Sequence, residues 1–314
     1  MDTLPEIDSA SPLQFIVNAS AGSSGAEATR EVVEAALQAG GRQGELLFCH
    51  PAELSRISNQ AATRAVATRT AVVAVGGDGT LNTVAQAAHA AGCAMGVVPR
   101  GTFNYFARTH GIPADPADAI RQLLRSTPAP VQVAGINDRV FLVNASVGLY
   151  PDLLEDREAY KARFGRSRWV AFVAACATLL RAQRRLHLHI EIGGKVRDTQ
   201  TLTLFVGNNR LQLQQFGAEP EDTLSGTPGD GTMAALVLRP IGTLSMIGLI
   251  LHGAMGRLGE AAGVERFEFE HLVVRPTVRQ GRGSMKVAFD GEVTMLSAPL
   301  DFRVLAKPLY LLKP

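Results

Sequence analysis

Short apolar runs separated by segments of helical period dominate the N-terminal third of the chain. Most of these runs end in a turn rich in glycine, serine, threonine or asparagine. The predicted strands are residues 13–17, 45–48, 71–75 and 95–98, and the predicted helices are residues 26–39, 51–67, 81–91 and 115–124. Repeated strand–turn–helix units predict a parallel α/β sheet whose loops gather at the carboxyl edge, where ligands bind.

The pattern changes after Pro130. Short β-rich runs, many of them alternating between polar and apolar residues, follow one another and predict an antiparallel β-sandwich or barrel. Two stretches of helical character, residues 152–184 and 241–260, interrupt these runs. We therefore expect an α/β domain at 13–130, ending in a linker at 127–130, and a β-sandwich domain at 131–300. The C-terminal segment, 301–314, is expected to return to the first domain.

Composition and charge fit a globular protein and do not point to nucleic-acid binding. Hydrophobic residues make up 46% of the chain and charged residues 19%, and the net charge is only +2. The three cysteines have no metal or redox spacing, which predicts buried thiols in a reducing compartment. The N-terminus lacks a signal-peptide pattern, and the longest apolar run, residues 169–180, is shorter than the roughly 20 residues that cross a bilayer. We expect a cytoplasmic protein without a transmembrane segment.

Residues 76–80, Gly-Gly-Asp-Gly-Thr, follow the third predicted strand and are called the catalytic turn below. Glycines let backbone N–H groups approach an anion closely, and the N-terminus of the next helix adds partial positive charge. Asp78 is the side chain of this turn that can hold a metal ion or receive a proton. The pattern predicts a phosphate site with a carboxylate beside it. A plain strand–helix turn is the alternative, although it needs fewer glycines.

Three further stretches carry candidate chemistry. Residues 18–25 form a small-residue turn after the first strand, and residues 99–104 form another after the fourth. Near the C-terminus, Asp290 and Glu292 flank Gly291. In a strand these two carboxylates would point to the same side, where they could hold Mg²⁺ or accept a proton, and their proximity would raise one pKa. Asp-Gly is also the strongest hairpin signal, so a β-turn is the alternative there.

In combination, these motifs resemble the catalytic domain shared by diacylglycerol kinases, sphingosine and ceramide kinases and soluble bacterial lipid kinases. The resemblance rests on the catalytic turn, on Pro-Arg-Gly-Thr-Phe-Asn at 99–104 and on Asp-Gly-Glu at 290–292. Asn-Ala-Ser-Val-Gly at 144–148, Gly-Asn-Asn at 207–209 and Asp-Gly at 230–231 follow in the expected order. Because NAD kinases also carry Gly-Gly-Asp-Gly-Thr, the combination of motifs, and not this one alone, distinguishes the lipid kinases.

The resemblance implies an α/β nucleotide-binding domain of the phosphofructokinase and NAD-kinase type, a C-terminal β-sandwich and an active site in the cleft between them. It also implies ATP, Mg²⁺ and transfer of the γ-phosphate to a lipid hydroxyl, with Glu292 as the base and Asp78 near the metal. The implied catalytic residues are Glu292, Asp78 and Asp290. Asp230, with the backbone carbonyls of Thr227 and Thr232, matches a structural Mg²⁺ loop. The implied nucleotide-binding residues are Asn18, Gly76, Gly77, Asp78, Gly79, Thr80, Asn82, Thr102 and Asn104. The acceptor would be diacylglycerol, a sphingoid base, ceramide or a phosphatidylglycerol-like lipid.

A lipid substrate implies peripheral contact with the inner face of a membrane. Residues 161–185 carry seven basic and no acidic side chains around the apolar run at 169–180, as in amphipathic segments that bind anionic headgroups. A buried helix with solvated basic ends is the alternative.

Two departures from the family pattern keep other functions open. Tyr105 stands where the family often has Asp, and Gly229 stands where the metal loop often begins with a second Asp. One alternative is a kinase of the NAD-kinase type that acts on a soluble substrate. The other is a lipid- or nucleotide-binding regulator without kinase activity.

Overall fold

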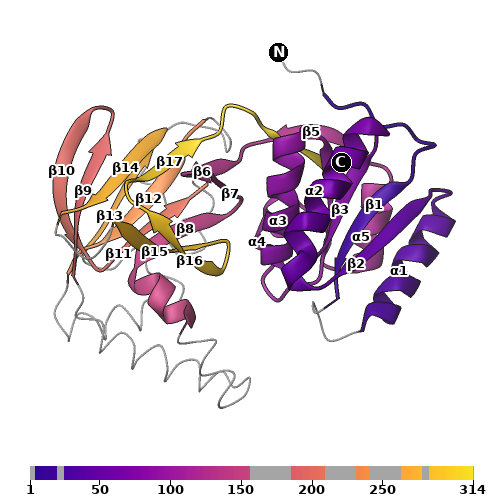
Figure 1. The fold of residues 1–314 in the computed structure, drawn as a ribbon, viewed down its shortest axis with the longest axis horizontal. Helices are drawn as coiled ribbons and strands as arrows, with labels where there is room; N and C mark the ends of the chain where they lie inside the picture. The colour runs from indigo at the N-terminus through magenta and orange to yellow at the C-terminus, as the bar shows by residue number, and fades with distance from the viewer. Residues whose placement is uncertain are drawn as a thin grey trace. The chain divides into compact units, whose positions relative to one another are not determined.

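A computed structural model describes residues 4–19, 25–155, 185–208, 231–240, 263–277 and 283–313. Within it the chain forms two compact units (Figure 1). The first unit combines residues 1–133 with the C-terminal residues 305–314, and the second consists of residues 134–304. The two units are described separately below.

The first unit is built on a six-stranded sheet flanked by helices (Figure 1). The strand order is β2 (Gly44–Cys49), β1 (Leu13–Asn18), β3 (Ala71–Gly76), β4 (Ala94–Pro99), β18 (Leu309–Lys313) and β5 (Thr127–Val131). Strands β2, β1, β3, β4 and β18 are mutually parallel, and β5 pairs antiparallel with β18. The helices are α1 (Ala26–Ala39), α2 (Pro51–Ala67), α3 (Asp78–Ala91), α4 (Tyr105–Thr109) and α5 (Pro116–Leu123).

The strand order reverses between β1 and β3, which makes the sheet doubly wound. Right-handed crossovers from such an order place α1 and α2 on opposite faces. Helix α2 packs against α3, and α1 packs against α5, so both faces of the sheet are covered. Every residue of β3 and β4 is buried, which explains why these strands are continuous apolar runs without alternation.

Two local predictions in this unit are wrong. Helix α3 begins at Asp78 with Gly77 as its N-cap, and not at Leu81, so the second half of the catalytic turn is already helical. Residues 127–130 are not a linker, because they belong to β5, which hydrogen-bonds to β18. Proline has no N–H to donate and is therefore tolerated in edge strands such as β5. The C-terminal strand β18 lies between β4 and β5 in the same sheet.

The second unit contains two six-stranded sheets in which every pairing is antiparallel. One sheet has the order β10 (Lys195–Thr201), β9 (Leu186–Ile192), β14 (His271–Pro276), β17 (Leu300–Val304), β6 (Ala134–Ile136) and β7 (Arg139–Phe141). The other has the order β13 (Val264–Phe269), β12 (Met233–Leu238), β11 (Thr203–Gly207), β8 (Asn144–Gly148), β15 (Ser284–Phe289) and β16 (Glu292–Ser297).

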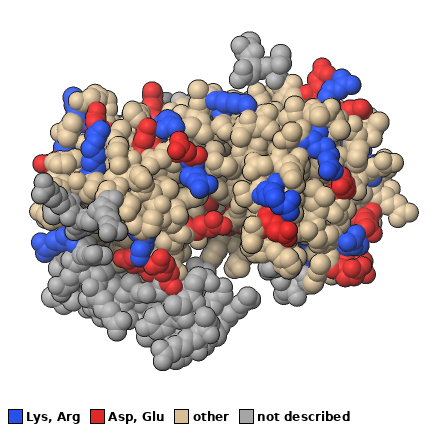
Figure 2. Space-filling model, in the orientation of Figure 1, with Lys and Arg blue, Asp and Glu red and all other residues tan. Residues whose placement is uncertain are grey.

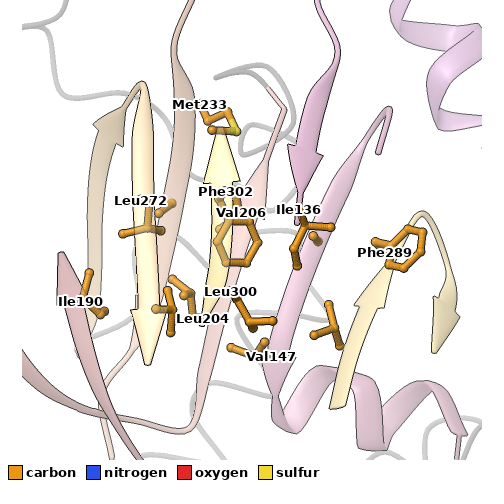
Figure 3. Packing of buried hydrophobic residues seen from close by; sticks show 14 of the residues in the cluster. Ile136, Val147, Ile190, Leu204, Val206, Met233, Leu272, Phe289, Leu300 and Phe302 are labelled. Carbon is orange, nitrogen blue, oxygen red and sulfur yellow. The ribbon is translucent and has the colours of Figure 1, made fainter. Parts of the chain in front are cut away.

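Side chains from both sheets form one core, which makes the unit a β-sandwich (Figure 3). Ile190, Leu272 and Phe302 from one sheet are fully buried with Val147 and Leu204 from the other. This core and the parallel sheet of the first unit together confirm the predicted fold class of a parallel α/β domain and an antiparallel β domain. Of the two helical stretches predicted here, residues 152–155 lie in a helix at 149–155, whereas 156–184 and 241–260 lie outside the described residues.

Charges of both signs are interspersed on the face of the molecule shown in Figure 2. In the second unit, Arg275 of β14 pairs with Glu191 of the neighbouring strand β9, and Lys286 of β15 pairs with Asp152 of the helix at 149–155. On this face, the described residues thus present a mixed surface, in keeping with the small net charge of the chain.

Candidate active site

The first candidate region lies where the strand order of the parallel sheet reverses. Asn18 ends β1, and the catalytic turn begins with the last residue of the neighbouring strand β3. The Asn18 side chain donates a hydrogen bond from Nδ2 to Oγ1 of Thr80, at 3.0 Å. Doubly wound sheets bind ligands at this switch point, outside the carboxyl ends of the strands. Asn18 and the catalytic turn, both predicted to bind the nucleotide, therefore lie together at this point of the sheet.

The third loop, residues 99–104, packs closely against the catalytic turn at Gly101 and Gly77. A Cβ atom added to Gly101 would lie 2.8 Å from Cα of Gly77, and one added to Gly76 would lie 2.6 Å from the Thr80 side chain. The carbonyl of Gly76 accepts a hydrogen bond from the Arg100 N–H, at 2.8 Å. Gly101 is required because the two loops approach too closely for a side chain there, and Gly76 is required because the Thr80 side chain of the same turn packs against it.

Asn104 shapes this third loop from within. Its backbone is left-handed, with φ at 49°, which asparagine tolerates better than most residues. Its side chain accepts a hydrogen bond from the Gly101 N–H at 2.8 Å and donates one to the Gly101 carbonyl at 2.9 Å. The loop is thereby closed onto itself directly before helix α4 begins at Tyr105.

Asp78 lies in the first turn of α3 and faces the start of α4. Burial raises the pKa of its carboxyl group, and interactions with the backbone N–H groups of Asn104, Tyr105 and Phe106 offset only part of that rise. Its Oδ1 atom is buried and has no hydrogen-bond partner. Buried carboxylate oxygens are normally paired, so an unpaired one at the mouth of a phosphate-type turn marks a place for a cation or a proton donor.

Introducing a side chain at Gly101 should separate the loops. In Gly101→Ala the new Cβ atom would lie 2.7 Å from Oδ1 of Asn104 as well as against Gly77. We expect a loss of about 1–3 kcal/mol in the free energy of unfolding, typical of overpacking. Thermal melts would measure it, and Thr102→Ala at an exposed neighbouring position should stay within about 0.5 kcal/mol of wild type. Equal melting temperatures for both variants would contradict the close packing.

The remaining nucleotide candidates are less tightly linked to this cluster. Gly79 lies inside the first turn of α3, and its carbonyl accepts a bond from the Thr83 hydroxyl. Asn82 is buried one turn further along, and Thr102 is exposed. Two features escaped prediction: Arg100 contacts the Thr29 hydroxyl on α1, and the Phe103 and Tyr105 rings stack with centroids 5.3 Å apart. Arg100 and Phe103 lie within the 99–104 motif and Tyr105 follows it directly, and this position is the sequence signal that could have identified them.

The second candidate region is the hairpin between β15 and β16. Phe289 and Glu292 are paired across it, and Asp290 and Gly291 form the two-residue turn with φ angles of 47° and 88°. The prediction that Asp290 and Glu292 share one side of a strand is therefore wrong, because both central residues are left-handed, as in a type I′ turn. Glu292 is the first residue of β16.

The two carboxylates of this hairpin have different surroundings. Asp290 is buried, and its oxygens accept hydrogen bonds from the backbone N–H groups of Leu142, Val143 and Asn144. The Glu292 side chain remains accessible to solvent, yet partial desolvation by the surrounding protein raises its pKa. Desolvation is the cause of that shift, and not the neighbouring carboxylate that the sequence pattern suggested.

Most of the predicted Mg²⁺ loop lies outside the described residues. Thr227 and Asp230 lie outside the described residues, whereas Thr232 precedes β12. Among the residues that the structure does describe, no group of three or more His, Cys, Asp or Glu side chains is arranged to hold a metal ion. Cys49 and Cys93 are buried free thiols, as predicted, and burial raises the pKa of Cys93 to about 11.

The sequence is similar to known proteins, chiefly in its N-terminal part. Residues 12–136 match the model of the diacylglycerol kinase catalytic domain. A protein of Klebsiella pneumoniae named "Probable lipid kinase YegS-like" is 38% identical over 98 residues, which are 30% of this chain and 33% of the relative. An uncharacterized protein of Synechocystis is 28% identical over 247 residues, covering 77% of this chain and 54% of its own length. The chain thus matches only a third to about half of the length of these relatives.

The fold has a solved counterpart over nearly its whole length. The crystal structure of a diacylglycerol kinase from Bacillus anthracis superposes with a TM-score of 0.70 at 17% identity, covering 96% of this chain and 97% of that one. Residues 12–136 thus match the diacylglycerol kinase catalytic domain, in agreement with the family that the motifs resemble.

Proposed function

We propose that this protein is a lipid kinase that transfers the γ-phosphate of ATP to a hydroxyl group of a lipid. The observation that carries the proposal is the buried, unpaired Oδ1 atom of Asp78 in the catalytic turn. This turn contacts Asn18 and packs against residues 99–104, within a stretch that matches the diacylglycerol kinase family. Phosphoryl transfer needs positioning and charge neutralisation, and the loops offer groups suited to both.

The loops fit the phosphates of a nucleotide. The close approach of Gly77 and Gly101 leaves backbone without side chains at the carboxyl edge of the sheet. Helix α3 begins there with Gly77 as its N-cap, so its first N–H groups and its dipole favour an anion. Asn18, Gly76, Thr80 and Asn104 would hold the loops in place around the phosphates, while Gly79, Asn82 and Thr102 stand close along the chain.

The same loops fit a magnesium ion that arrives with the nucleotide. Mg²⁺ is usually held by one or two carboxylates together with substrate phosphates and water, so a dedicated cluster of acidic residues is not needed. Asp78 would be that carboxylate, because its Oδ1 atom lacks a partner. When bound, the ion would neutralise charge on the phosphates. We propose Thr227, Asp230 and Thr232 as a separate structural site.

Glu292 would act as the general base on the acceptor hydroxyl. A base works best when its pKa lies near the operating pH, and the raised pKa of Glu292 moves it in that direction. Because its side chain stays accessible, a substrate hydroxyl can reach it. The acceptor would be presented at a membrane surface, where such lipids reside; none of the described helices is long and apolar enough to span a membrane.

Transfer of ³²P from labelled ATP tests this function against its alternatives. We expect label in the organic phase when the protein is incubated with a total lipid extract and Mg²⁺, and no transfer to NAD. Label on NAD would instead establish a soluble-substrate kinase of the NAD-kinase type. Binding of ATP without transfer to either acceptor would establish a regulator.

A further inference from the structure

Residues 142–144, which form the turn after β7 and the first residue of β8, make hydrogen bonds with two distant parts of the β-sandwich. All three of their backbone N–H groups point to the carboxylate of Asp290. Oδ2 accepts from Leu142 at 2.7 Å, and Oδ1 accepts from Val143 at 2.8 Å and from Asn144 at 3.1 Å. The Asp290 N–H donates in return to the Asn144 carbonyl at 2.9 Å. The tip of the β15–β16 hairpin is thereby fixed to this turn.

Asn208 donates hydrogen bonds to two carbonyl groups of the same turn. Its Nδ2 atom donates to the Leu142 carbonyl at 3.0 Å, and its backbone N–H donates to the Val143 carbonyl at 2.9 Å. Asn208 is 2% exposed and Asp290 is 5% exposed, so this network is shielded from water. Residues from three separated motifs, 144–148, 207–209 and 290–292, are thus joined in one cluster.

A hairpin does not need such a cluster in order to turn. Asp-Gly forms a two-residue turn through its backbone preferences, whichever way the aspartate side chain points. Burying a carboxylate is costly unless hydrogen bonds replace its lost hydration, and here three consecutive N–H groups do so. The buried carboxylate of Asp290 therefore fixes the position of this turn, which lies two residues from Glu292.

We propose that Asp290 is a positioning residue that fixes the start of β16, and with it the Glu292 carboxylate, by locking the hairpin tip to residues 142–144. This inference rests on the proposed role of Glu292 as the base. With three N–H groups on its oxygens, Asp290 serves as an anchor, and the proton of the acceptor hydroxyl goes to Glu292. The two neighbouring acids therefore have separate tasks.

Asp290→Asn tests the proposal, because asparagine keeps the shape of the side chain but places an NH₂ group where one oxygen accepts. Glu292 would be followed by NMR titration of its ¹³C-labelled carboxyl group, assigned by comparison with Glu292→Gln. We expect the Glu292 pKa to fall toward its ordinary value of 4.5, because a loosened hairpin admits water. We also expect kcat on the lipid to fall about tenfold or more, with the KM for ATP within about twofold of wild type.

Two further variants keep the result decisive. Asn208→Ala loosens the same turn from the other side and serves if Asp290→Asn does not fold; it should lower the Glu292 pKa in the same direction. Asn137→Ala is the matched control: Asn137 is also left-handed, and its side chain bonds to Ser297 and Asp301 on other strands. It should lower the melting temperature without moving the Glu292 pKa.

An unshifted Glu292 pKa in a folded Asp290→Asn or Asn208→Ala protein would overturn the positioning role, whatever the rate. The titration does not depend on turnover, so it remains informative if the protein phosphorylates no lipid. Failure of the proposed function would show instead as absent transfer by the wild-type protein. The two failures are therefore distinguishable.

Discussion

Replacing Glu292 with glutamine is expected to lower kcat for lipid phosphorylation by about 10²–10⁴-fold, the usual contribution of a general base. Glutamine has nearly the same size but cannot take the proton of the acceptor hydroxyl. Glu292 is exposed at the start of an edge strand and is not one of the described side chains that form the β-sandwich core, so the fold should be unchanged. Steady-state kinetics with saturating lipid and ATP would measure the effect.

The pH dependence of kcat in the wild-type protein is a second test of the role of Glu292. Activity requires the deprotonated carboxylate, so kcat should fall as the pH is lowered through the Glu292 pKa. Because desolvation raises that pKa, the midpoint of the acid limb should lie above the ordinary value of 4.5. Wild-type turnover in Glu292→Gln, or an acid limb below 4.5, would contradict the assignment of the base.

Replacing Asp78 with asparagine is expected to have opposite effects on activity and on stability. Turnover should fall by about 10²–10³-fold, as when one preorganised electrostatic contact to a reacting group is removed. Stability at neutral pH should rise, because the variant no longer carries a desolvated carboxylate with an unpaired oxygen. Steady-state kinetics and thermal melts on the same preparations would show both effects.

The sign of the stability effect follows from proton linkage. The pKa of Asp78 is raised in the folded state, so the folded protein binds this proton more tightly than the unfolded chain does. Wild type therefore loses stability as the pH rises from the ordinary value of 3.8 through the raised pKa. The advantage of Asp78→Asn in melting temperature should be larger at pH 7 than at pH 3.

Asp118→Asn provides the matched control for Asp78. Asp118 is also an acidic residue in the first turn of a helix, but it is exposed and pairs with Arg121. Its replacement should leave turnover unchanged and cost at most about 1 kcal/mol, the range of a helix-dipole contact. If Asp78→Asn were less stable than wild type at pH 7, or fully active, the account of the unpaired oxygen would be wrong.

The parallel sheet was largely predictable because its strands are buried on both faces. Continuous apolar runs such as 71–75 leave little doubt about the strands, and the bounds of α1 and α2 were predicted to the residue. The start of α3 was misplaced because glycines at 76, 77 and 79 suggest a longer turn. In the structure Asp78 lies in the first turn of α3, and its carboxyl group interacts with residues 104–106, a tertiary contact without a local sequence signal.

The hairpin at 290–291 shows a different limit of the sequence. The Asp-Gly pair at 290–291 is compatible with a strand that has Asp290 and Glu292 on one side and with a tight turn. The resemblance to the kinase motifs favoured the strand. The turn is what forms, and the contact that distinguishes the two acids links residues 142–144 with residue 290. A contact between residues so far apart along the chain is not visible in the pattern of polar and apolar residues. The pairing of β18 with β4 and β5 is likewise set by tertiary structure.

The most direct test of the central claim is the stoichiometry of the transferred phosphate. Purified wild-type protein would be incubated with ATP, Mg²⁺ and mixed vesicles containing diacylglycerol, a sphingoid base, ceramide and phosphatidylglycerol. ADP would be counted against lipid phosphomonoester by ³¹P NMR and mass spectrometry. A lipid kinase produces one phosphomonoester per ADP, and Glu292→Gln produces neither above background. ADP with inorganic phosphate and no new lipid phosphate, or equal product from Glu292→Gln, would contradict the account.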